Sequence, residues 1–348
     1  MRYLFYISKK YSIPIVKPLS EYLKKMDHEF AFYVSEKVNK NIPDEWKEFL
    51  IMNEIDKAIN YHPDFVIVPG NFVDPRIPGI KVQIFHGLGI EKKSHYKIRH
   101  FFDVYGTSGP FITERYKKLQ KRYKYFLVQE TGWPKIDHIL NYPTENLKKK
   151  LNIPKGKKII LFAPTHSRKM QSAEELLPII PKIVNEDEIW FVKFHELMDK
   201  NLIRNFTVQT KEKVRITDDP DITPYLHLAD VLISDTSSVV YEFMVLDKPV
   251  ITFETINRKD KGINIIDPDD LRKAIDRSLE NPGEFSSNRK KHLEEINPYL
   301  NGKISERLIN ILLEIKEKDL LPKKRMPLNL FRKLQIIHHR KFRKGYLR

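Results

Sequence analysis

Short apolar runs rich in β-branched and aromatic residues alternate with helix-like segments along the whole chain, and this alternation most constrains the fold. The first half predicts strands at Tyr3–Ile7, Phe30–Val34, Phe65–Val68, Lys81–Phe85, Val104–Gly106 and Phe126–Val128. The second half predicts strands at Lys158–Ala163, Ile189–Phe194, Val214–Thr217, Val231–Ser234 and Val250–Phe253. Strands that alternate with helices form parallel sheets with crossover helices, so we expect an α/β protein.

The segments between the strands carry the helical patterns. In the first half these are Pro18–Met26, Glu45–Asn60 and Pro110–Arg122. In the second half they are Ala173–Val184, Thr223–Ala229, Ser238–Leu246, Asp269–Glu280 and Glu284–Ile296. Neither half contains a G-x-G-x-x-G or P-loop motif, so a dinucleotide oxidoreductase or a P-loop NTPase would lack its usual fingerprint.

At 348 residues, the chain is longer than a single hydrophobic core usually supports. A polar stretch at 141–157, punctuated by Pro143, Pro154 and Gly156, separates the two halves. We therefore predict two Rossmann-like domains facing a cleft, at 1–140 and 141–302. A C-terminal helix and a basic tail are expected at 303–348.

The net charge of +16 is concentrated near the C-terminus, because ten Lys and Arg residues and no carboxylate follow Pro322. Phe331–Tyr346 interleaves cations with apolar side chains, which is typical of an interfacial helix attracted to anionic lipid. A disordered solubilising extension is the alternative. A nucleic-acid-binding protein is a rival of another class, since these cations could engage phosphates. The rest of the chain has no recognised nucleic-acid motif, so we expect no nucleic-acid partner.

The absence of cysteine excludes disulfides, zinc-thiolate sites and cysteine nucleophiles. No run approaches the roughly 18 apolar residues of a membrane span, and the N-terminus lacks the apolar region of a signal peptide. We therefore expect a cytoplasmic protein. The absence of a G-x-S-x-G elbow argues against a Ser-His-Asp hydrolase.

Ligands of parallel α/β sheets bind beyond the carboxyl ends of the strands. Five predicted strands are followed there by polar or small residues: His86 and Gly87; Gly132; Thr165 and Arg168; His195; and Asp235, Thr236, Ser237 and Ser238. This pattern favours a ligand site over simple helix caps.

Each of these residues also has a purely structural interpretation. The Ser and Thr hydroxyls before the predicted helix Ser238–Leu246 are suited to capping its first turn or to binding an anion. His86 is suited to act as a general base near neutral pH, or to serve as a hydrogen-bonded strand end. His195 shares a strand face with Lys193, so it is either a phosphate contact or a surface histidine. No metal-ligand spacing joins His86, His166 and His195, so we expect no obligatory metal and no other cofactor.

Six blocks, taken together and in order, resemble the CDP-glycerol glycerophosphotransferase family of teichoic-acid primases and polymerases. They are IFHGLG, YGTSGPFITERY, ETGWPKIDHIL, ILFAPTHSR, VKFHE and DVLISDTSSVVYEFMVLDKPVITFE, within Lys81–Glu254. The resemblance implies a GT-B-like fold whose C-terminal domain holds the donor. It implies transfer of glycerol phosphate or ribitol phosphate from CDP-glycerol or CDP-ribitol to a hydroxyl, with release of CMP, in cell-envelope polymer synthesis. The acceptor would be polyprenyl-linked or lipid-anchored, which places the protein at the inner face of the membrane.

The resemblance also implies roles for individual residues. His86 matches the base that deprotonates the acceptor, and His195 matches the histidine that assists the leaving group. Ser237 and Ser238 match the pair that holds the donor diphosphate. Thr165 and Arg168 match another donor-side block, and the region from Gly132 to Asp137 matches a supporting one. Lys193, Thr236 and Glu242 complete the predicted donor site, Glu242 as a ribose contact, with Gly87 and Asp235 in support.

Departures from the family pattern affect substrate identity more than chemistry. Leu88 and Gly89 follow Gly87 where the family usually has Thr-Pro, and Glu196 replaces the usual proline after His195. Trp133 occupies the place of a tyrosine. The nearest alternative is a GT-B glycosyltransferase that uses a nucleotide sugar, and release of CMP rather than UDP would distinguish the two.

Overall fold

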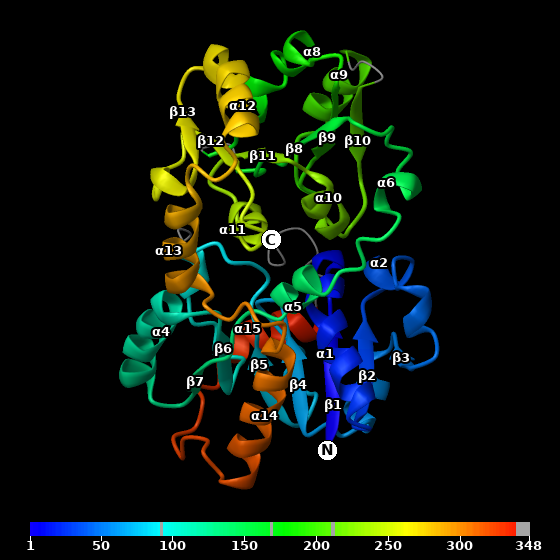
Figure 1. Cartoon of the computed structure of the whole chain (residues 1–348). Coiled ribbons are helices and arrows are strands. Elements are labelled where there is room, and N and C mark those ends of the chain that lie inside the picture. Colours follow the sequence, from blue (N-terminus) through cyan, green and yellow to red (C-terminus); the bar gives the residue numbers. More distant parts are fainter. Residues whose placement is uncertain (91–92, 168–169, 210–212, 339–348) are drawn as a thin grey trace. The chain divides into compact units, whose positions relative to one another are not determined.

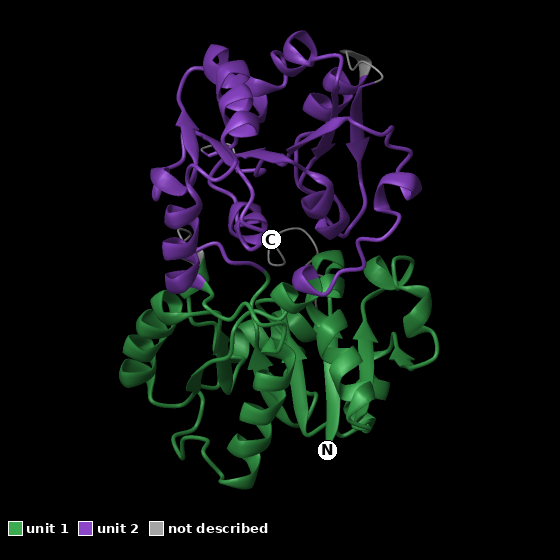
Figure 2. Cartoon of the chain, viewed as in Figure 1, with its two compact units in different colours: residues 1–86, 93–138, 297–348 green, residues 87–92, 139–296 purple. Residues whose placement is uncertain are grey.

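A computed structural model describes residues 1–90, 93–167, 170–209 and 213–338 of the protein. The chain divides into two compact units (Figure 2), each with its own parallel sheet. Unit 1 consists of Met1–His86, Lys93–His138 and Asn297–Arg348, and unit 2 consists of Gly87–Lys92 and Ile139–Ile296. The predicted α/β class with two parallel sheets is confirmed.

In the described part of unit 1, seven strands form a sheet in the order β3-β2-β1-β4-β5-β6-β7 (Figure 1). The strands are β1 (Arg2–Ile7), β2 (Glu29–Val34), β3 (Leu50–Met52), β4 (Phe65–Val68), β5 (Ile80–Gln83), β6 (Val104–Thr107) and β7 (Leu127–Glu130). The central strands β1 and β4 pair in register from Tyr3 opposite Phe65, and both are almost wholly apolar and buried, as expected for a parallel sheet covered on both faces.

The helices of unit 1 connect these strands and complete the unit from the C-terminal end of the chain. They are α1 (Ile13–Lys25), α2 (Glu36–Asn39), α3 (Ile55–Asn60), α4 (Pro110–Tyr123), α14 (Ile304–Glu317) and α15 (Leu330–Ile337), with short 3-10 turns at Lys10–Ser12, Asp44–Trp46 and Lys93–Tyr96. α14 packs against α1. α5 (Lys135–Leu140) carries the chain from unit 1 into unit 2.

In the described part of unit 2, six strands form the order β10-β9-β8-β11-β12-β13. They are β8 (Lys158–Phe162), β9 (Glu188–Lys193), β10 (Val214–Thr217), β11 (Val231–Ser234), β12 (Val250–Phe253) and β13 (Ile263–Ile265). The helices are α6 (Leu147–Lys150), α7 (Ala173–Leu176), α8 (Ile180–Ile183), α9 (Lys200–Gln209), α10 (Thr223–Leu228), α11 (Val239–Met244), α12 (Leu271–Glu280) and α13 (Ser286–Ile296). Side chains of the central strands, such as Ile160, Trp190 and Ile233, form the core with α7 and α12.

Several predicted elements differ from the structure. The helix predicted at Glu45–Asn60 is instead a 3-10 turn, the edge strand β3 and the short helix α3. The helix predicted at Ala173–Val184 is divided into α7 and α8, because Pro178 and Pro181 lack the N–H that a continuous helix needs. β13 and α9 lie outside the predicted elements.

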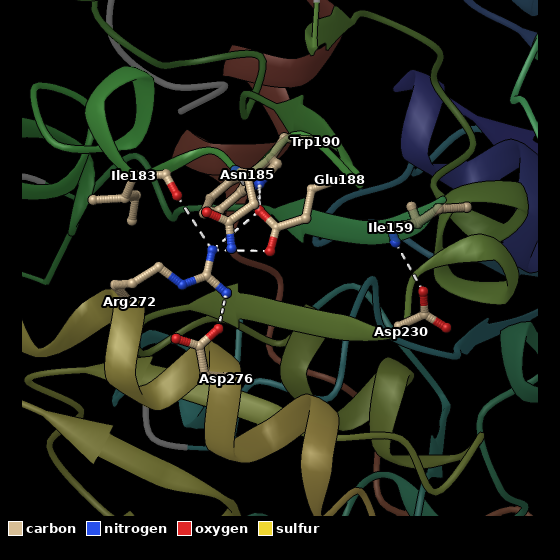
Figure 3. A network of polar contacts seen from close by, with 8 residues as sticks. All are labelled: Ile159, Ile183, Asn185, Glu188, Trp190, Asp230, Arg272 and Asp276. Carbon is tan, nitrogen blue, oxygen red and sulfur yellow. Dashed lines mark hydrogen bonds and ion pairs between the residues drawn. The ribbon is translucent and has the colours of Figure 1, made fainter. Parts of the chain in front are cut away.

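A buried ion-pair network joins β9 to α12, at the amino end of the strand (Figure 3). Glu188 is 1% exposed and accepts hydrogen bonds from the Trp190 indole at 2.9 Å and from the Arg272 guanidinium at 2.8 and 3.1 Å. Arg272 also donates to the Ile183 carbonyl at 3.2 Å and to the Asp276 carboxylate. Each buried charge therefore has a hydrogen-bonded partner, as burial requires.

Among the described residues, no helix is long and apolar enough to cross a membrane. α15 begins one residue before the interfacial helix predicted at Phe331–Tyr346. The part of that prediction from residue 339 onward lies outside the described residues.

Candidate active site

The predicted donor residues of unit 2 gather at the carboxyl ends of three adjacent strands, β9, β8 and β11. Thr165 and His166 follow β8, His195 follows β9, and Ser237 and Ser238 follow β11. Neighbouring parallel strands end at the same edge of a sheet, which is where α/β proteins bind ligands. Arg168, the remaining donor residue predicted after β8, lies outside the described residues.

Asp235 fastens the loop after β8 to the end of β11. Its fully buried carboxylate accepts hydrogen bonds from the Thr165 amide at 3.1 and 3.0 Å, and from the amide and hydroxyl of Ser172 at 3.0 Å each. The Ser234 hydroxyl adds a bond to the Ala163 carbonyl at 2.6 Å. Asp235 therefore supports the site as a buried acceptor that fixes the loop after β8.

The three hydroxyl residues before α11 have different environments. Thr236 is buried, and its hydroxyl lies 3.4 Å from the Thr255 hydroxyl and accepts from the Ile256 amide at 3.3 Å. Ser237 and Ser238 are half-buried. Ser238 is the N-cap residue of α11, but its side chain makes no capping hydrogen bond. The helix-cap interpretation of this hydroxyl therefore loses its support, whereas a ligand role remains available. Glu242 is buried one turn further along α11.

His195 is exposed and has a defined tautomer when it is neutral. The Leu197 amide donates to its Nδ1 atom at 3.1 Å, so the neutral ring carries its proton on Nε2. This N–H is suited to donate to a phosphate oxygen. The His166 ring lies against it, with centroids 4.0 Å apart and planes inclined by 30°. His166 was not among the predicted site residues, although its place directly after β8 was a signal for it.

Lys193 extends toward β10. Its ammonium donates to the main-chain carbonyl of Asp219 at 2.5 Å, and burial raises the pKa of the Asp219 carboxyl. Lys193 therefore contributes positive charge two residues before His195 in the chain, while it also anchors the loop after β10.

In unit 1, His86 follows an unusual backbone conformation. Phe85 has a φ of 59°, a left-handed value that is rare for a bulky residue. Its ring and the Tyr116 ring form a T-shaped pair with centroids 5.2 Å apart, and its carbonyl accepts a hydrogen bond from the Trp133 indole at 3.3 Å. Trp133 is itself 1% exposed, and its amide donates to the Asn297 side chain at 2.9 Å. The orientation of His86 thus depends on contacts that local sequence does not reveal.

Two further aromatic rings lie beside His86. The centroid of the Tyr11 ring is 5.3 Å from that of the His86 ring. The His95 ring lies edge to face with the His86 ring, with centroids 5.2 Å apart. The Tyr116 hydroxyl donates to the His95 carbonyl at 2.5 Å, and burial raises the pKa of Tyr116, so the hydroxyl stays protonated. These neighbours were not predicted. The position of Tyr11 just beyond β1 is the feature that would have indicated it.

Gly132 and Asp137 hold the C-terminal helix α14 to unit 1. Gly132 has a φ of 84°, and a Cβ there would lie 2.8 Å from the Ile304 side chain. The Asp137 carboxylate accepts from the amides of Ile304, at 3.0 Å, and Ser305, at 2.6 Å, which are the first two residues of α14. This region therefore supports the unit rather than lining the strand ends directly.

Among the described residues, no group of three or more His, Asp or Glu side chains is arranged to hold a metal ion. The pair of His166 and His195 lacks a third such ligand in this part of the chain. The arrangement instead offers hydroxyls, an imidazole N–H and an ammonium, which are groups that bind phosphate oxygens.

Comparison with known proteins identifies the family. A sequence model described as CDP-glycerol:poly(glycerophosphate) glycerophosphotransferase matches residues 92–314. The teichoic acid glycerol-phosphate primase of Bacillus spizizenii is 26% identical over 270 residues, which cover 70% of this chain and 68% of the relative. The teichoic acid poly(glycerol phosphate) polymerase of the same species is 29% identical over 175 residues, covering 47% of this chain and 43% of the relative.

Solved structures share the fold. The wall teichoic acid polymerase TagF has a TM-score of 0.67 at 17% identity, with 91% of this chain and 89% of that chain covered. A UDP-N-acetylglucosamine 2-epimerase has a TM-score of 0.62 at 15% identity, covering 94% and 98%. Structural likeness at this identity shows the two-domain GT-B-like fold alone, whereas the family match spans well over half of the sequence. The chain belongs to the CDP-glycerol:poly(glycerophosphate) glycerophosphotransferase family.

Proposed function

We propose that this protein transfers an alditol phosphate, glycerol phosphate or ribitol phosphate, from a CDP-alditol to a hydroxyl of a lipid-anchored acceptor. Family membership over residues 92–314 is the observation that carries this proposal. The phosphate-binding groups at the ends of β8, β9 and β11 support it, because phosphoryl transfer depends mainly on positioning and on neutralising charge.

The residues divide the chemistry between them. His86 takes the proton from the acceptor hydroxyl as the oxygen forms a bond to the β-phosphorus of the donor. The bond from that phosphorus to the bridging oxygen breaks, and CMP leaves with the electron pair. Ser237, Ser238 and the Nε2–H of His195 bind the diphosphate oxygens and stabilise the charge that develops on CMP. Glu242 binds the ribose.

A donor screen tests this proposal directly. Purified protein is incubated with CDP-glycerol, CDP-ribitol or UDP-sugars and a lipid-linked acceptor, and released nucleotide is quantified. We expect CMP from a CDP-alditol and no UDP. His86→Ala should reduce CMP release by about 10²–10⁴-fold, the usual contribution of a general base, while donor affinity stays near that of the wild type. UDP release, or full activity in the His86 variant, contradicts the proposal.

We further propose that α15 binds an anionic membrane surface, where a lipid-anchored acceptor resides. Leu330, Phe331 and Leu334 on this helix are 61%, 72% and 52% exposed. Arg332 and Lys333 lie on the same helix, and its N-cap residue Asn329 donates from its side-chain amide to the Arg99 carbonyl at 2.9 Å. Exposed apolar side chains next to cations are the features of a helix that lies in a lipid interface.

Vesicle sedimentation tests the membrane proposal. We expect Phe331→Ser/Leu334→Ser to weaken binding to phosphatidylglycerol vesicles at least about tenfold, since each buried side chain contributes about 1.5–3 kcal/mol. Ile266→Ser, at a 70% exposed position in unit 2, is the matched control and should leave binding unchanged. Added salt should weaken binding by screening the cations. Equal binding by both variants, or preference for duplex DNA over vesicles, contradicts this part.

A further inference from the structure

Gly87 lies directly against Ser238 within unit 2. A Cβ added at Gly87 would be 3.1 Å from Ser238 Oγ and 3.5 Å from Ser238 Cβ. The first distance is tighter than ordinary van der Waals contact, and the second is ordinary. The absence of a side chain at Gly87 therefore leaves the space that the Ser238 hydroxyl occupies.

The backbone around Gly87 has little freedom to move away from a new Cβ. Leu88 is fully buried and Ile90 is 1% exposed. Withdrawing the segment would expose these apolar side chains to water, which opposes the movement. A Cβ at position 87 is therefore expected to displace Ser238 rather than the backbone of its own segment.

The Ser238 side chain is the part that can move. Its hydroxyl makes no capping hydrogen bond to α11, so no cap is lost when it turns to another rotamer. A methyl group at position 87 should thus redirect the hydroxyl and leave the fold nearly unchanged. A change confined to Ser238 matters only if this hydroxyl binds a ligand.

We propose that Gly87 is a positioning residue of the donor site, which directs the Ser238 hydroxyl toward the diphosphate of the CDP-alditol. This inference rests on the proposed function of Ser238. It also explains why glycine immediately follows His86: the residue after the base is in contact with a donor-binding side chain, so any larger residue there disturbs donor binding.

A double-mutant cycle on the full chain tests the proposal. CDP-glycerol or CDP-ribitol, whichever donor the wild type uses, is titrated calorimetrically into the wild type, Gly87→Ala, Ser238→Ala and the double variant. We expect each single variant to raise the Kd about 10–150-fold, as loss of a hydrogen bond to a charged group does. The double variant should bind no more weakly than Ser238→Ala, because the added methyl group then meets only a Cβ at ordinary contact distance. Gly283→Ala, where an added Cβ meets nothing within 4 Å, should bind like the wild type.

The outcomes separate this inference from the proposed function. An unchanged donor Kd in Gly87→Ala overturns the positioning role of Gly87. A double variant whose increase in Kd equals the product of the two single increases also overturns it. If the wild type releases CMP but Ser238→Ala binds the donor with unchanged affinity, this inference is overturned and the proposed activity stands. A wild type that releases no CMP overturns the proposed function and this inference with it. If the positioning role is right, Gly87→Ala should not lower the melting temperature. If it does, and the double variant with Ser238→Ala melts at the same lowered temperature, the glycine is needed for folding and the positioning role is overturned.

Discussion

At the scale of single residues, the strained backbone before His86 is the most informative feature of unit 1. A bulky residue with positive φ costs of order 1–3 kcal/mol, so it persists only where its surroundings impose it. At Phe85 these surroundings are the Tyr116 ring and the Trp133 indole that binds the Phe85 carbonyl. The conformation is therefore maintained where the proposed base requires a fixed orientation.

Trp133→Phe tests this dependence. The variant keeps an aromatic ring but removes the donor to the Phe85 carbonyl, so the peptide before His86 should lose its fixed position. We expect kcat for CMP release to fall about tenfold, since small displacements of a catalytic group are costly, while the donor Kd stays unchanged. Trp190→Phe is the matched control: it removes an equally buried indole, bonded to Glu188 in unit 2, and should lower stability but not kcat. An unchanged kcat in Trp133→Phe would show that the bond does not orient His86.

The sequence located those candidate site residues that lie just beyond strands, because strand ends can be located from apolar runs. His86, His195, Ser237 and Ser238 belong to this class. The partnership of Trp133 with Phe85 spans 48 residues, and the stacking of His166 on His195 joins two separate strands. Such contacts depend on sheet order, which a single sequence does not specify.

At the scale of elements, the buried central strands were predictable and the short edge strands were not. β8 after Lys158 and β11 before Ser234 are uninterrupted apolar runs buried on both faces, a pattern that identifies strands of a parallel sheet. β3 and β13 are three residues long and lie at sheet edges, so their pairing with β2 and β12 rather than their local sequence makes them strands. Tertiary pairing overrode the helical pattern at Glu45–Asn60 in this way.

The link between β9 and α12 leads to a stability prediction. Arg272→Met should lower the free energy of unfolding by about 3 kcal/mol, because it leaves the buried Glu188 carboxylate without its cation. Glu188→Leu combined with Arg272→Met should recover most of this loss, since neither charge then remains buried. Urea unfolding followed by tryptophan fluorescence measures both changes.

Arg277→Met provides the control on the same helix. Arg277 pairs with Glu284 at the surface and its side chain is 57% exposed, so solvent screening makes this pair contribute little to stability. A loss in Arg272→Met no larger than in this control would show that the buried pair does not hold α12 to β9.

At the scale of the whole molecule, each unit is assembled from segments that are distant in sequence. Unit 2 includes Gly87–Lys92 from the first half of the chain, and unit 1 includes Asn297–Arg348 from its end. The links are specific: Ile304 packs on Gly132, and the Lys316 ammonium pairs with the Asp64 carboxylate. Local composition indicates the linker near 141–157. It does not indicate which distant segments join each unit, because this depends on contacts between residues more than a hundred positions apart.

Because unit 2 includes a segment from the first half of the chain, donor binding should change amide hydrogen exchange in segments that are distant in sequence. If unit 2 holds the donor, CDP-glycerol or CDP-ribitol should slow amide exchange at 163–167, 193–197 and 235–242, and also at 87–90, although the last segment lies far away in sequence. At a donor concentration of about 100 times the Kd, openings that require donor release become roughly 100-fold rarer. The sheet core at Tyr3–Ile7 should exchange equally slowly with and without donor, because β1 is paired with its neighbours β2 and β4.

Protection at 235–242 without protection at 87–90 would separate Gly87 from the donor site. Protection confined to unit 1 would place the donor elsewhere, because binding free energy can slow only those openings that disturb the bound ligand.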